Sequence, residues 1–569
     1  MTPVWVLPAR LTGDVDAPPG IGPLAARILI HRGLADPEAA RRFLAPSLDQ
    51  LHDPNLMRGM DAAVARLARA IRASEKILLY GDYDVDGTVS VVLLTKVIQM
   101  AGGVVEYHVP HRLKDGYGMR ADVVEAAAAS GVRLIVSVDT GIRAAEVVRR
   151  AAELSIDVIV TDHHLPEAEL PPALAVLNPN RPDCAYPDKN LCGAGVAFKL
   201  AQALAAALPW SEQKRRRVAE SLLKLVAIAT IADVVPLTGE NRVIVKHGLA
   251  GLDEVRNPGL RALLDVAGFA RGTAPGARQV AFRIAPRLNA AGRMDSARDA
   301  VELFLTGDAA RAAELARGLH DRNAERRQAE DEVREICQRV AVDPSASALV
   351  YYDETWHRGV IGIVASRLVE RFHRPVFVLG RNSGDGLAQG SGRSIPAFHL
   401  LHALESMADL FVRFGGHEFA AGVTLDAARV EEFRRRFNAR AAACLRPEDL
   451  VPRIEIDALA SPADLTGPGV AGVFALAPFG NGNPPPLLAA LGVEVTGVSP
   501  LGKDGKHLKV TVRGDGRVLS LKAWSFAERA AELPPGARVD IAFSLEEDAY
   551  SAARGYPGWA AELRHVRPA

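Results

Sequence analysis

The stretch KILLYGDYDVDGT, Lys76–Thr88, decides the fold that this sequence predicts. Its apolar run Ile77–Tyr80 has the length and composition of a short buried strand, and the sequence that follows is compatible with a helix to Met100. Between the two lie three alternating carboxylates, Asp82, Asp84 and Asp86. Because a charge is costly to bury, three of them at a strand end require a counter-charge.

A divalent cation supplies that counter-charge, because carboxylate oxygens suit Mg²⁺ and Mn²⁺. Two alternatives stay open for the stretch by itself, a solvated acidic turn and a calcium-binding loop. A calcium loop of the EF-hand kind needs a central glycine and a glutamate at its twelfth position, between two helices. The apolar run before Gly81 argues against that arrangement.

Strand and helix patterns alternate on both sides of this stretch and beyond it. The pattern predicts further strands over 104–109, 134–138 and 158–160, and helices over 121–129 and 144–154. Strands rich in Ile and Val that alternate with helices favour a parallel, doubly wound α/β sheet. The apolar run 222–232 reads as one more helix of the same domain.

Acidic and histidine residues follow the predicted strands at the point where each ends. Asp139 follows the third strand, the triplet Asp162-His163-His164 follows the fourth, and Asp233 follows the apolar run 225–229. Parallel strands place their carboxyl ends along one edge of the sheet, where ligands bind. We therefore expect these side chains and the carboxylates of 82–86 to converge on one site.

The number of candidate ligands exceeds what one ion needs. A lone histidine pair is more often a surface or capping feature, but this pair follows a strand that ends beside several carboxylates. The set fits two cations about 3.5–4 Å apart that share one carboxylate. Such a pair favours hydrolysis of a phosphoester by water, without a covalent enzyme intermediate. No GxSxG, Walker A or GxGxxG sequence suggests another chemistry.

The whole chain is too long for one core and predicts several domains. Residues 1–50 are a Pro-punctuated lead-in, residues 51–307 form the catalytic α/β domain, and residues 308–342 form one long linker helix. Residues 343–447 form a second α/β domain, and residues 448–569 carry β-like runs that suggest a small barrel. The expected fold class is therefore multidomain α/β with a C-terminal β-barrel.

Composition limits the location of the protein more than its substrate. Basic and acidic residues balance at 68 each, which neither indicates nor excludes nucleic acid. The four cysteines form no CxxC pair, which fits a reducing compartment. The first ten residues lack a signal-peptide pattern, and no apolar stretch approaches about 18 residues. We expect a cytoplasmic protein without a membrane span.

These motifs resemble the DHH phosphoesterase superfamily, which is named after a triplet like Asp162-His163-His164. Its successive motifs correspond in order to residues 81–88, 137–141, 161–166 and 231–237. Further segments look like the RecJ family within it, at residues 286–294, 356–363, 415–422 and 478–484. The resemblance covers roughly residues 50–565, and the combination of motifs is highly specific.

The resemblance implies a chain of DHH, DHHA1 and OB-fold domains. It also implies an enzyme that removes mononucleotides from single-stranded DNA in the 5′-to-3′ direction. It implies two divalent cations, Mn²⁺ or Mg²⁺. One ion would be held by Asp86, Asp139, His163 and Asp233, and the other by Asp82, Asp84 and Asp139. His164 would lie near the scissile phosphate or behind the ligands. A monomer is implied, with roles in DNA repair and recombination and with a single-strand-binding protein and a repair helicase as partners.

Glycine-rich segments of the second domain are candidates for binding the substrate. Small residues let backbone N–H groups approach a phosphate, and an arginine offers two parallel donors. Together with the resemblance, this predicts a clamp for the terminal phosphate or nucleotide, formed by Ser391, Arg393, Gly415, Gly416 and His417. The polar candidates on the catalytic domain are Arg287, Asn289 and Arg293. The alternatives are simple glycine turns for the clamp and anchoring of the linker helix for the second set.

Basic residues elsewhere carry a weaker signal. The run 214–217, KRRR, reads as a solvated helix face rather than a phosphate track. In the barrel, Lys503, Lys506, His507 and Lys509 surround a turn, with Trp524, Phe526, Tyr556 and Trp559 nearby in sequence. Basic residues with exposed aromatic rings suit base stacking along single strands. Most barrel aromatics are core, so the sequence predicts a binding role for the domain and not for individual rings.

Three rival functions stay open. A DHH-type phosphodiesterase of short oligonucleotides or cyclic dinucleotides would not need the barrel from about residue 453. A non-catalytic DNA-binding scaffold would be expected to have lost ligands, whereas all the expected ligands are present here. An inorganic pyrophosphatase would not need residues 450–569.

Overall fold

The computed structural model describes residues 3–8, 21–111, 118–294, 297–339, 345–356, 359–381, 386–502, 505–552, 554–555 and 557–569. The side chains of residues 293–294, 338–339 and 549–550 also lie outside this description. The chain divides into two compact units. The larger unit takes its residues from 6–292, 296–316 and 455–569, and the smaller unit takes most of its residues from 317–454.

The larger unit contains a five-stranded parallel sheet with the order β3-β2-β4-β5-β6. Its strands are β2 Lys76–Tyr80, β3 Val104–His108, β4 Val132–Val138, β5 Asp157–Thr161 and β6 Ala175–Leu177. The parallel register pairs Tyr80 with Ser137 and Val138 with Thr161, so neighbouring strands end almost level. The predicted doubly wound sheet is confirmed, with the short strand β6 in addition.

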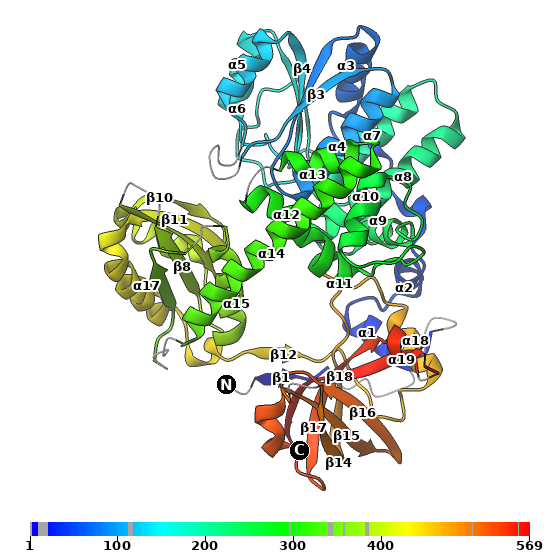
Figure 1. The fold of residues 1–569 in the computed structure, drawn as a ribbon, viewed down its shortest axis with the longest axis vertical. Helices are drawn as coiled ribbons and strands as arrows, with labels where there is room; N and C mark the ends of the chain where they lie inside the picture. Colours follow the sequence, from blue (N-terminus) through cyan, green and yellow to red (C-terminus); the bar gives the residue numbers. More distant parts are fainter. Residues whose placement is uncertain are drawn as a thin grey trace. The chain divides into compact units, whose positions relative to one another are not determined.

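Helices cover both faces of this sheet, as Figure 1 shows. Leu78, Ile135, Val158 and Val160 belong to a buried cluster with Val124 of α5 Ala121–Ala129 and Val148 of α6 Ala145–Glu153. The opposite face meets α3 Met60–Arg72, α4 Val85–Met100 and α7 Gly193–Ala207. Strands buried on both faces explain why the strand sequences read as continuous apolar runs rather than as an alternation.

Further helices complete the part of the larger unit that surrounds the parallel sheet: α8 Glu212–Ala232, α9 Gly239–Ala250, α10 Pro258–Val266, α11 Ala277–Gln279, α12 Ala285–Met294 and α13 Arg298–Leu305. Helix α8 packs on α4, α7 and α9, which brings its C-terminal end to the carboxyl edge of the sheet. Residues Val280–Ile284 form a π-helical turn just before α12. Such turns are rare in proteins, and those that occur are often found at functional sites.

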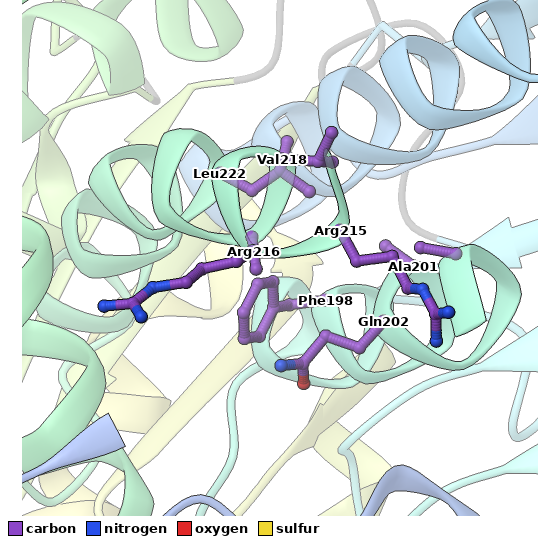
Figure 2. Close-up of a pocket in the computed structure, with 9 residues that line it drawn as sticks. Phe198, Ala201, Gln202, Arg215, Arg216, Val218 and Leu222 are labelled. Atoms are coloured by element: carbon purple, nitrogen blue, oxygen red, sulfur yellow. The ribbon is translucent and has the colours of Figure 1, made fainter. Parts of the chain in front are cut away.

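A pocket of about 220 Å³ lies between α7 and the first part of α8. In Figure 2, Phe198 and Gln202 of α7 face Val218 and Leu222 of α8, and Arg215 and Arg216 point away from each other at its rim. Arg216 pairs with Glu220 at 2.8 Å, and the Lys214 ammonium lies 3.9 Å from the centre of the Trp210 ring. These contacts fit a solvated helix face for the run 214–217.

The C-terminal part of the larger unit is a β-barrel. Its strands are β13 Ala458–Leu459, β14 Leu488–Leu501, β15 His507–Gly514, β16 Arg517–Ala523, β17 Arg538–Glu547 and β18 Trp559–Pro568. They follow the order β13-β14-β15-β16-β18-β17, and pairing of β14 with β17 closes the barrel. The N-terminal helices α1 Pro23–His31 and α2 Pro37–Leu44 bury Leu24, Ile28 and Ala40 in the same core.

The smaller unit holds a second α/β fold with the strand order β10-β11-β9-β8-β7. Its strands are β7 Leu349–Asp353, β8 Val376–Arg381, β9 Leu387–Arg393, β10 Phe411–Gly416 and β11 Ala420–Asp426. Helices α15 Ile361–Phe372, α16 Leu400–Glu405 and α17 Val430–Cys444 belong to it. Helix α14, Ala309–Arg339, is the long helix that the sequence predicts between the two α/β folds.

Among the residues that the structure describes, no helix combines the length and the apolar character that crossing a bilayer needs.

A buried ion pair joins α7 to α9 beside the parallel sheet. Lys199 and Glu240 are almost fully buried, and their charged atoms lie 2.5 Å apart. Glu240 also accepts hydrogen bonds from the Tyr186 hydroxyl at 2.5 Å and the His52 backbone N–H at 2.7 Å. Burial lowers the pKa of Lys199, while Glu240 opposes that shift. The network satisfies the charges that it buries, as a stable interior requires.

Glu240→Ala should therefore leave the Lys199 ammonium buried without its carboxylate. We expect a loss of about 3–5 kcal/mol in the free energy of unfolding. The measurement is a urea unfolding curve of the protein, whose midpoint and slope give that free energy. Glu220→Ala, which removes the partner of the exposed Arg216, is the matched control and should leave the stability nearly unchanged, because water screens an exposed ion pair. Equal effects of the two substitutions would contradict this prediction.

Candidate metal centre

The carboxyl edge of the parallel sheet gathers the acidic residues that the sequence singles out. Asp82 lies just beyond β2, Asp139 follows β4 directly, and Asp162 follows β5. Asp233 caps the C-terminus of α8 at the same edge. Asp82, Asp86, Asp139 and Asp162 are all buried. The expected convergence is therefore observed, although the individual side chains play different roles.

The loop from Asp82 to Gly87 leads into α4. Asp84 is the N-cap of this helix, and its Oδ1 accepts a hydrogen bond from the Gly87 N–H at 3.0 Å. Gly87 lies so close to the loop that an added Cβ would be 2.6 Å from the Asp82 nitrogen. Asn289 of α12 accepts a hydrogen bond from the Val85 N–H at 3.2 Å. The turn is therefore held from within and by a neighbouring helix.

The N-terminus of α7 holds Asp86. The carboxylate accepts hydrogen bonds from the Gly193 N–H at 2.6 Å and the Ala194 N–H at 2.8 Å. Backbone N–H groups at a helix N-terminus are a common binding place for an anionic group. An added Cβ at Gly193 would lie 2.7 Å from Asp139 Oδ1. A glycine is therefore needed where α7 begins between the two carboxylates.

His163 lies between carboxylates from different elements. Its Nε2 is 3.2 Å from Asp139 Oδ1, 3.7 Å from Asp233 Oδ2 and 3.8 Å from Asp86 Oδ2. Burial lowers the pKa of His163 despite these negative neighbours. The neutral imidazole that this favours is the form that binds a metal.

Asp162 serves the backbone and the second histidine. Its Oδ1 accepts hydrogen bonds from the N–H groups of His163 at 2.8 Å and His164 at 3.0 Å, and lies 2.7 Å from His164 Nδ1. Its Oδ2 accepts the Ile142 N–H at 3.0 Å. Asp162 therefore orients the histidine pair. Although burial opposes the shift, the hydrogen bond and charge of Asp162 raise the pKa of His164.

The ligand atoms form overlapping groups. Within each group, one candidate ligand atom from each residue lies no more than 4.8 Å from the others. The first group is Asp82, Asp84 and Asp139, the second is Asp86, His163 and Asp233, and the third is Asp139, His163 and His164. The first two groups are separate triads, and Asp139 lies in the first triad while approaching His163 of the second. Two neighbouring cation sites fit this pattern, with Asp139 between them.

The electrostatics of the cluster call for cations. Burial, followed by the charges of Asp86, Asp84, Asp82 and Asp233, raises the pKa of Asp139 well above its ordinary value. Burial and the charges of Asp86 and Asp84 raise the pKa of Asp233 to about 9. Asp139 Oδ1 and Asp233 Oδ2 are buried atoms without a hydrogen-bond partner. Unsatisfied oxygens that face a histidine nitrogen fit ligation of a hard divalent ion.

Two residues of the cluster region adopt a backbone conformation that is unusual for their type. Asp139 and Val234 both have φ near 60°, in the left-handed region. For Val234, a β-branched residue, this conformation is a genuine outlier. Strained backbone of this kind concentrates at functional sites and persists only when its surroundings hold it.

The candidate substrate residues of the larger unit have partners within the fold. The Arg287 guanidinium donates hydrogen bonds to the backbone oxygens of Arg283 and Val266, and Asn289 contacts the Asp84–Asp86 loop through Val85. The side chain of Arg293 lies outside the described residues. Asn289 thus contacts the acidic loop 82–87, which the sequence did not indicate.

The candidate clamp of the smaller unit lies on adjacent strands. Gly415 of β10 pairs with Gly422 of β11, and Gly422 pairs with Ser391 of β9. Arg393 Nη1 donates a hydrogen bond to Ser391 Oγ at 3.0 Å, and both side chains approach Gly362 near the N-terminus of α15. His417 lies in the turn between β10 and β11, where its N–H bonds to the Ala420 oxygen at 2.8 Å. Clamp residues from β9 and from the β10–β11 hairpin therefore belong to the same small sheet.

The barrel aromatics separate into core and surface. Phe526 is 7% exposed, and Trp559 packs against the barrel core. Trp524 is 45% exposed and lies edge-on to His507, with ring centres 4.8 Å apart. The His507 ring is held by a hydrogen bond from the Ser525 N–H at 2.9 Å. Lys503 and Tyr556 lie outside the described residues.

Known families match three parts of the chain. The "DHH family, N-terminal domain" model matches residues 76–230, the "DHHA1 domain" model residues 345–443, and the "RecJ OB domain" model residues 456–555. These ranges coincide with the parallel sheet, the second α/β fold and the barrel.

Curated relatives named single-stranded-DNA-specific exonuclease RecJ align along much of the chain. The protein of Dickeya dadantii is 41% identical over 456 residues, which are 77% of this chain and 78% of the relative. The protein of Bacillus subtilis is 39% identical over 525 residues, which are 92% of this chain but 65% of that relative. The chain thus spans a little under two thirds of the Bacillus protein.

A solved structure supports the same relationship. The crystal structure of RecJ in complex with Mn²⁺ from Thermus thermophilus superposes with a TM-score of 0.84 at 34% identity. The match covers all of this chain and 80% of that one.

The raised carboxyl pKa values predict how stability without metal depends on pH. Free aspartic acid titrates near pH 3.9, and Asp233 titrates near 9 in the fold. The folded, metal-free protein therefore binds protons more tightly, and the stability that they confer is lost as pH rises toward 9. Between pH 7 and 9, we expect a loss on the order of 1 kcal/mol per pH unit, followed by thermal unfolding in chelator.

Asp233→Asn is the matched variant, because it removes the titrating group at the same size. Its metal-free melting temperature should depend less on pH between 7 and 9. Mg²⁺ should stabilise the unsubstituted protein more at pH 8.5 than at pH 7, because cations then displace fewer protons. A melting temperature that rises with pH in chelator would contradict the crowded-carboxylate interpretation.

Proposed function

This chain belongs to the RecJ family, and on that premise we propose that it is a metal-dependent exonuclease that removes mononucleotides from single-stranded DNA in the 5′-to-3′ direction. The observation that carries the proposal is the pair of ligand triads that meet at Asp139. A small-molecule hydrolase would need the same metals. The barrel at residues 456–555 favours a long strand as substrate.

The catalytic residues of this proposal are Asp82, Asp84, Asp86, Asp139, His163, His164 and Asp233. Asp82, Asp84 and Asp139 would hold one Mn²⁺ or Mg²⁺ ion, and Asp86, Asp139, His163 and Asp233 the other. When bound, such a pair lowers the pKa of water and stabilises charge on phosphoryl oxygens. The cluster fits this use because its oxygens are buried and Asp139 Oδ1 and Asp233 Oδ2 have no hydrogen-bond partner.

The chain's own groups orient this chemistry. The Gly193 and Ala194 N–H groups hold the Asp86 carboxylate, and Asp162 holds the His164 ring and the backbone N–H of His163. Because the pKa of His164 is raised, its ring stays doubly protonated up to a higher pH than an ordinary histidine ring does. In our proposal this imidazolium faces the scissile phosphate and donates to an oxygen on which charge develops.

The clamp residues would select the end of the strand. We assign Ser391, Arg393, Gly415, Gly416 and His417 to the terminal phosphate or nucleotide, because the Arg393 fork and the α15 N-terminus both favour an anion. Arg287, Asn289 and Arg293 are assigned to the strand from the catalytic side. Trp524 and its basic neighbours Lys506 and Lys509 suit stacking and phosphate contacts on the barrel.

The domain plan and the cellular setting follow from the same proposal. Residues 51–307 form the catalytic domain, 308–342 the linker helix, 343–447 the DHHA1 domain and 448–569 the strand-binding barrel, after the lead-in 1–50. The enzyme would act as a monomer in the cytoplasm, in DNA repair and recombination. A single-strand-binding protein and a repair helicase would supply the substrate.

End-labelled DNA tests the polarity. With a 5′ label on a single strand, we expect the label to appear in a mononucleotide from the first turnover. With a 3′ label, the labelled product should be a strand that becomes progressively shorter. The reaction should require Mn²⁺ or Mg²⁺ and should spare blunt duplex. Early release of the 3′ label, or preference for dinucleotides over long strands, would contradict the proposed function.

Asp139→Asn is the variant that links this activity to the site. Because groups that merely orient metal ligands are worth about 10–100-fold in activity, loss of a ligand shared by both ions should cost more than about 100-fold. Asp122→Asn, which alters an exposed carboxylate on α5, is the matched control and should keep full activity. Equal activity of the two variants would refute the assignment.

A further inference from the structure

The loop that carries Asp233 is bound by a segment that leads into the barrel. Asn481 Nδ2 donates a hydrogen bond to the Val234 backbone oxygen at 2.6 Å, and the Leu237 N–H donates to the Asn481 backbone oxygen at 2.7 Å. Two glycines complete the contact. An added Cβ would lie 2.6 Å from Leu237 Cδ1 at Gly480 and 2.8 Å from Pro236 Cβ at Gly482.

The Asp233 loop needs support because of its backbone conformation. Helix α8 ends at Ala232, Asp233 is its C-cap, and Val234 follows with φ near 60°. Glycine usually occupies this position after a helix, because a Cβ is unfavourable in the left-handed region. Val234 is also 64% exposed, so packing of its side chain does not compensate. The conformation must be stabilised from outside the residue.

The segment that supplies Asn481 is itself firmly held. Asn483 is buried and donates hydrogen bonds to the Leu476 oxygen at 2.9 Å and the Pro478 oxygen at 2.8 Å. The Arg242 guanidinium donates to the Ala477 oxygen at 2.9 Å. Asn481 therefore extends from a fixed turn, which can hold a strained partner in place.

We infer that Asn481 is a positioning residue for metal binding: it holds Val234 in the left-handed conformation and thereby directs the Asp233 carboxylate toward Asp86 and His163. This inference rests on the proposed function, because Asp233 must be a metal ligand. It assigns to residues 478–484, which lie between β13 and β14 of the barrel, a part in building the metal site. The barrel is then fastened to the catalytic centre at a ligand loop.

The test compares Mn²⁺ binding in the full-length chain without DNA, by titration calorimetry, with the Mn²⁺ concentration that gives half-maximal nuclease activity. Groups that orient metal ligands contribute about 10–100-fold to affinity, so Asn481→Ala should weaken Mn²⁺ binding about 10-fold. The double variant Asn481→Ala/Val234→Gly should bind within about 3-fold of the original protein, because glycine adopts the conformation without strain.

Asn257→Ala is the matched control. Asn257 also joins a helix terminus to a neighbouring element, through its bonds to the Leu260 N–H and the Phe304 oxygen, but it bonds neither the Asp233 loop nor residues 81–87. It should leave Mn²⁺ binding unchanged even if it lowers the melting temperature, whereas a purely structural role for Asn481 would give the two variants the same profile.

Two outcomes would overturn the inference. One is unchanged Mn²⁺ binding by Asn481→Ala while Asp233→Ala binds weakly, and the other is a double variant no better than Asn481→Ala. If Asp233→Ala itself bound Mn²⁺ normally, the proposed metal site would be wrong, and the inference would fall with it.

Discussion

Repulsion among buried carboxylates is the constraint on which this structure depends. Asp82, Asp86 and Asp139 are buried, Asp84 and Asp233 lie beside them, and the pKa values of Asp84, Asp139 and Asp233 are all raised. At an effective dielectric constant of 20, two unit charges 4 Å apart repel by about 4 kcal/mol. A fold that keeps such groups together gains nothing from them unless positive charge enters the cluster.

The surrounding structure prevents the cluster from relaxing by spreading apart. The N-terminus of α7 holds Asp86, Asn289 holds the turn before α4, Asp162 orients the histidine pair, and Asn481 holds the residue after Asp233. The α7 N-terminus, Asn289 and Asn481 lie far along the chain from the groups that they hold, whereas Asp162 directly precedes the two histidines. Groups that act together in a site need such support, because their geometry must exist before a ligand arrives.

The sequence predicted the sheet and the convergence of the acidic and histidine side chains because both have local signals. Apolar runs that end in Asp or in Asp-His-His mark strand ends, and parallel strands must end at one edge. The supporting contacts have no such signal: Asp86 meets Gly193 over 107 residues, and Asn481 meets Val234 over 247. The partners there are backbone N–H and C=O groups, which every residue has. Asp162 looked like one more converging carboxylate, but the N–H groups directly after it occupy its oxygens. The strand β6 was missed because Ala175–Leu177 is too short to show a period.

Anomalous scattering from crystals grown with Mn²⁺ tests the central claim most directly. Two manganese peaks per chain should appear, one ligated by Asp82, Asp84 and Asp139 and the other by Asp86, His163 and Asp233, with Asp139 reaching both. Absence of manganese from this edge of the sheet, or carboxylates that bond only to protein groups and leave no space for cations, would contradict the account.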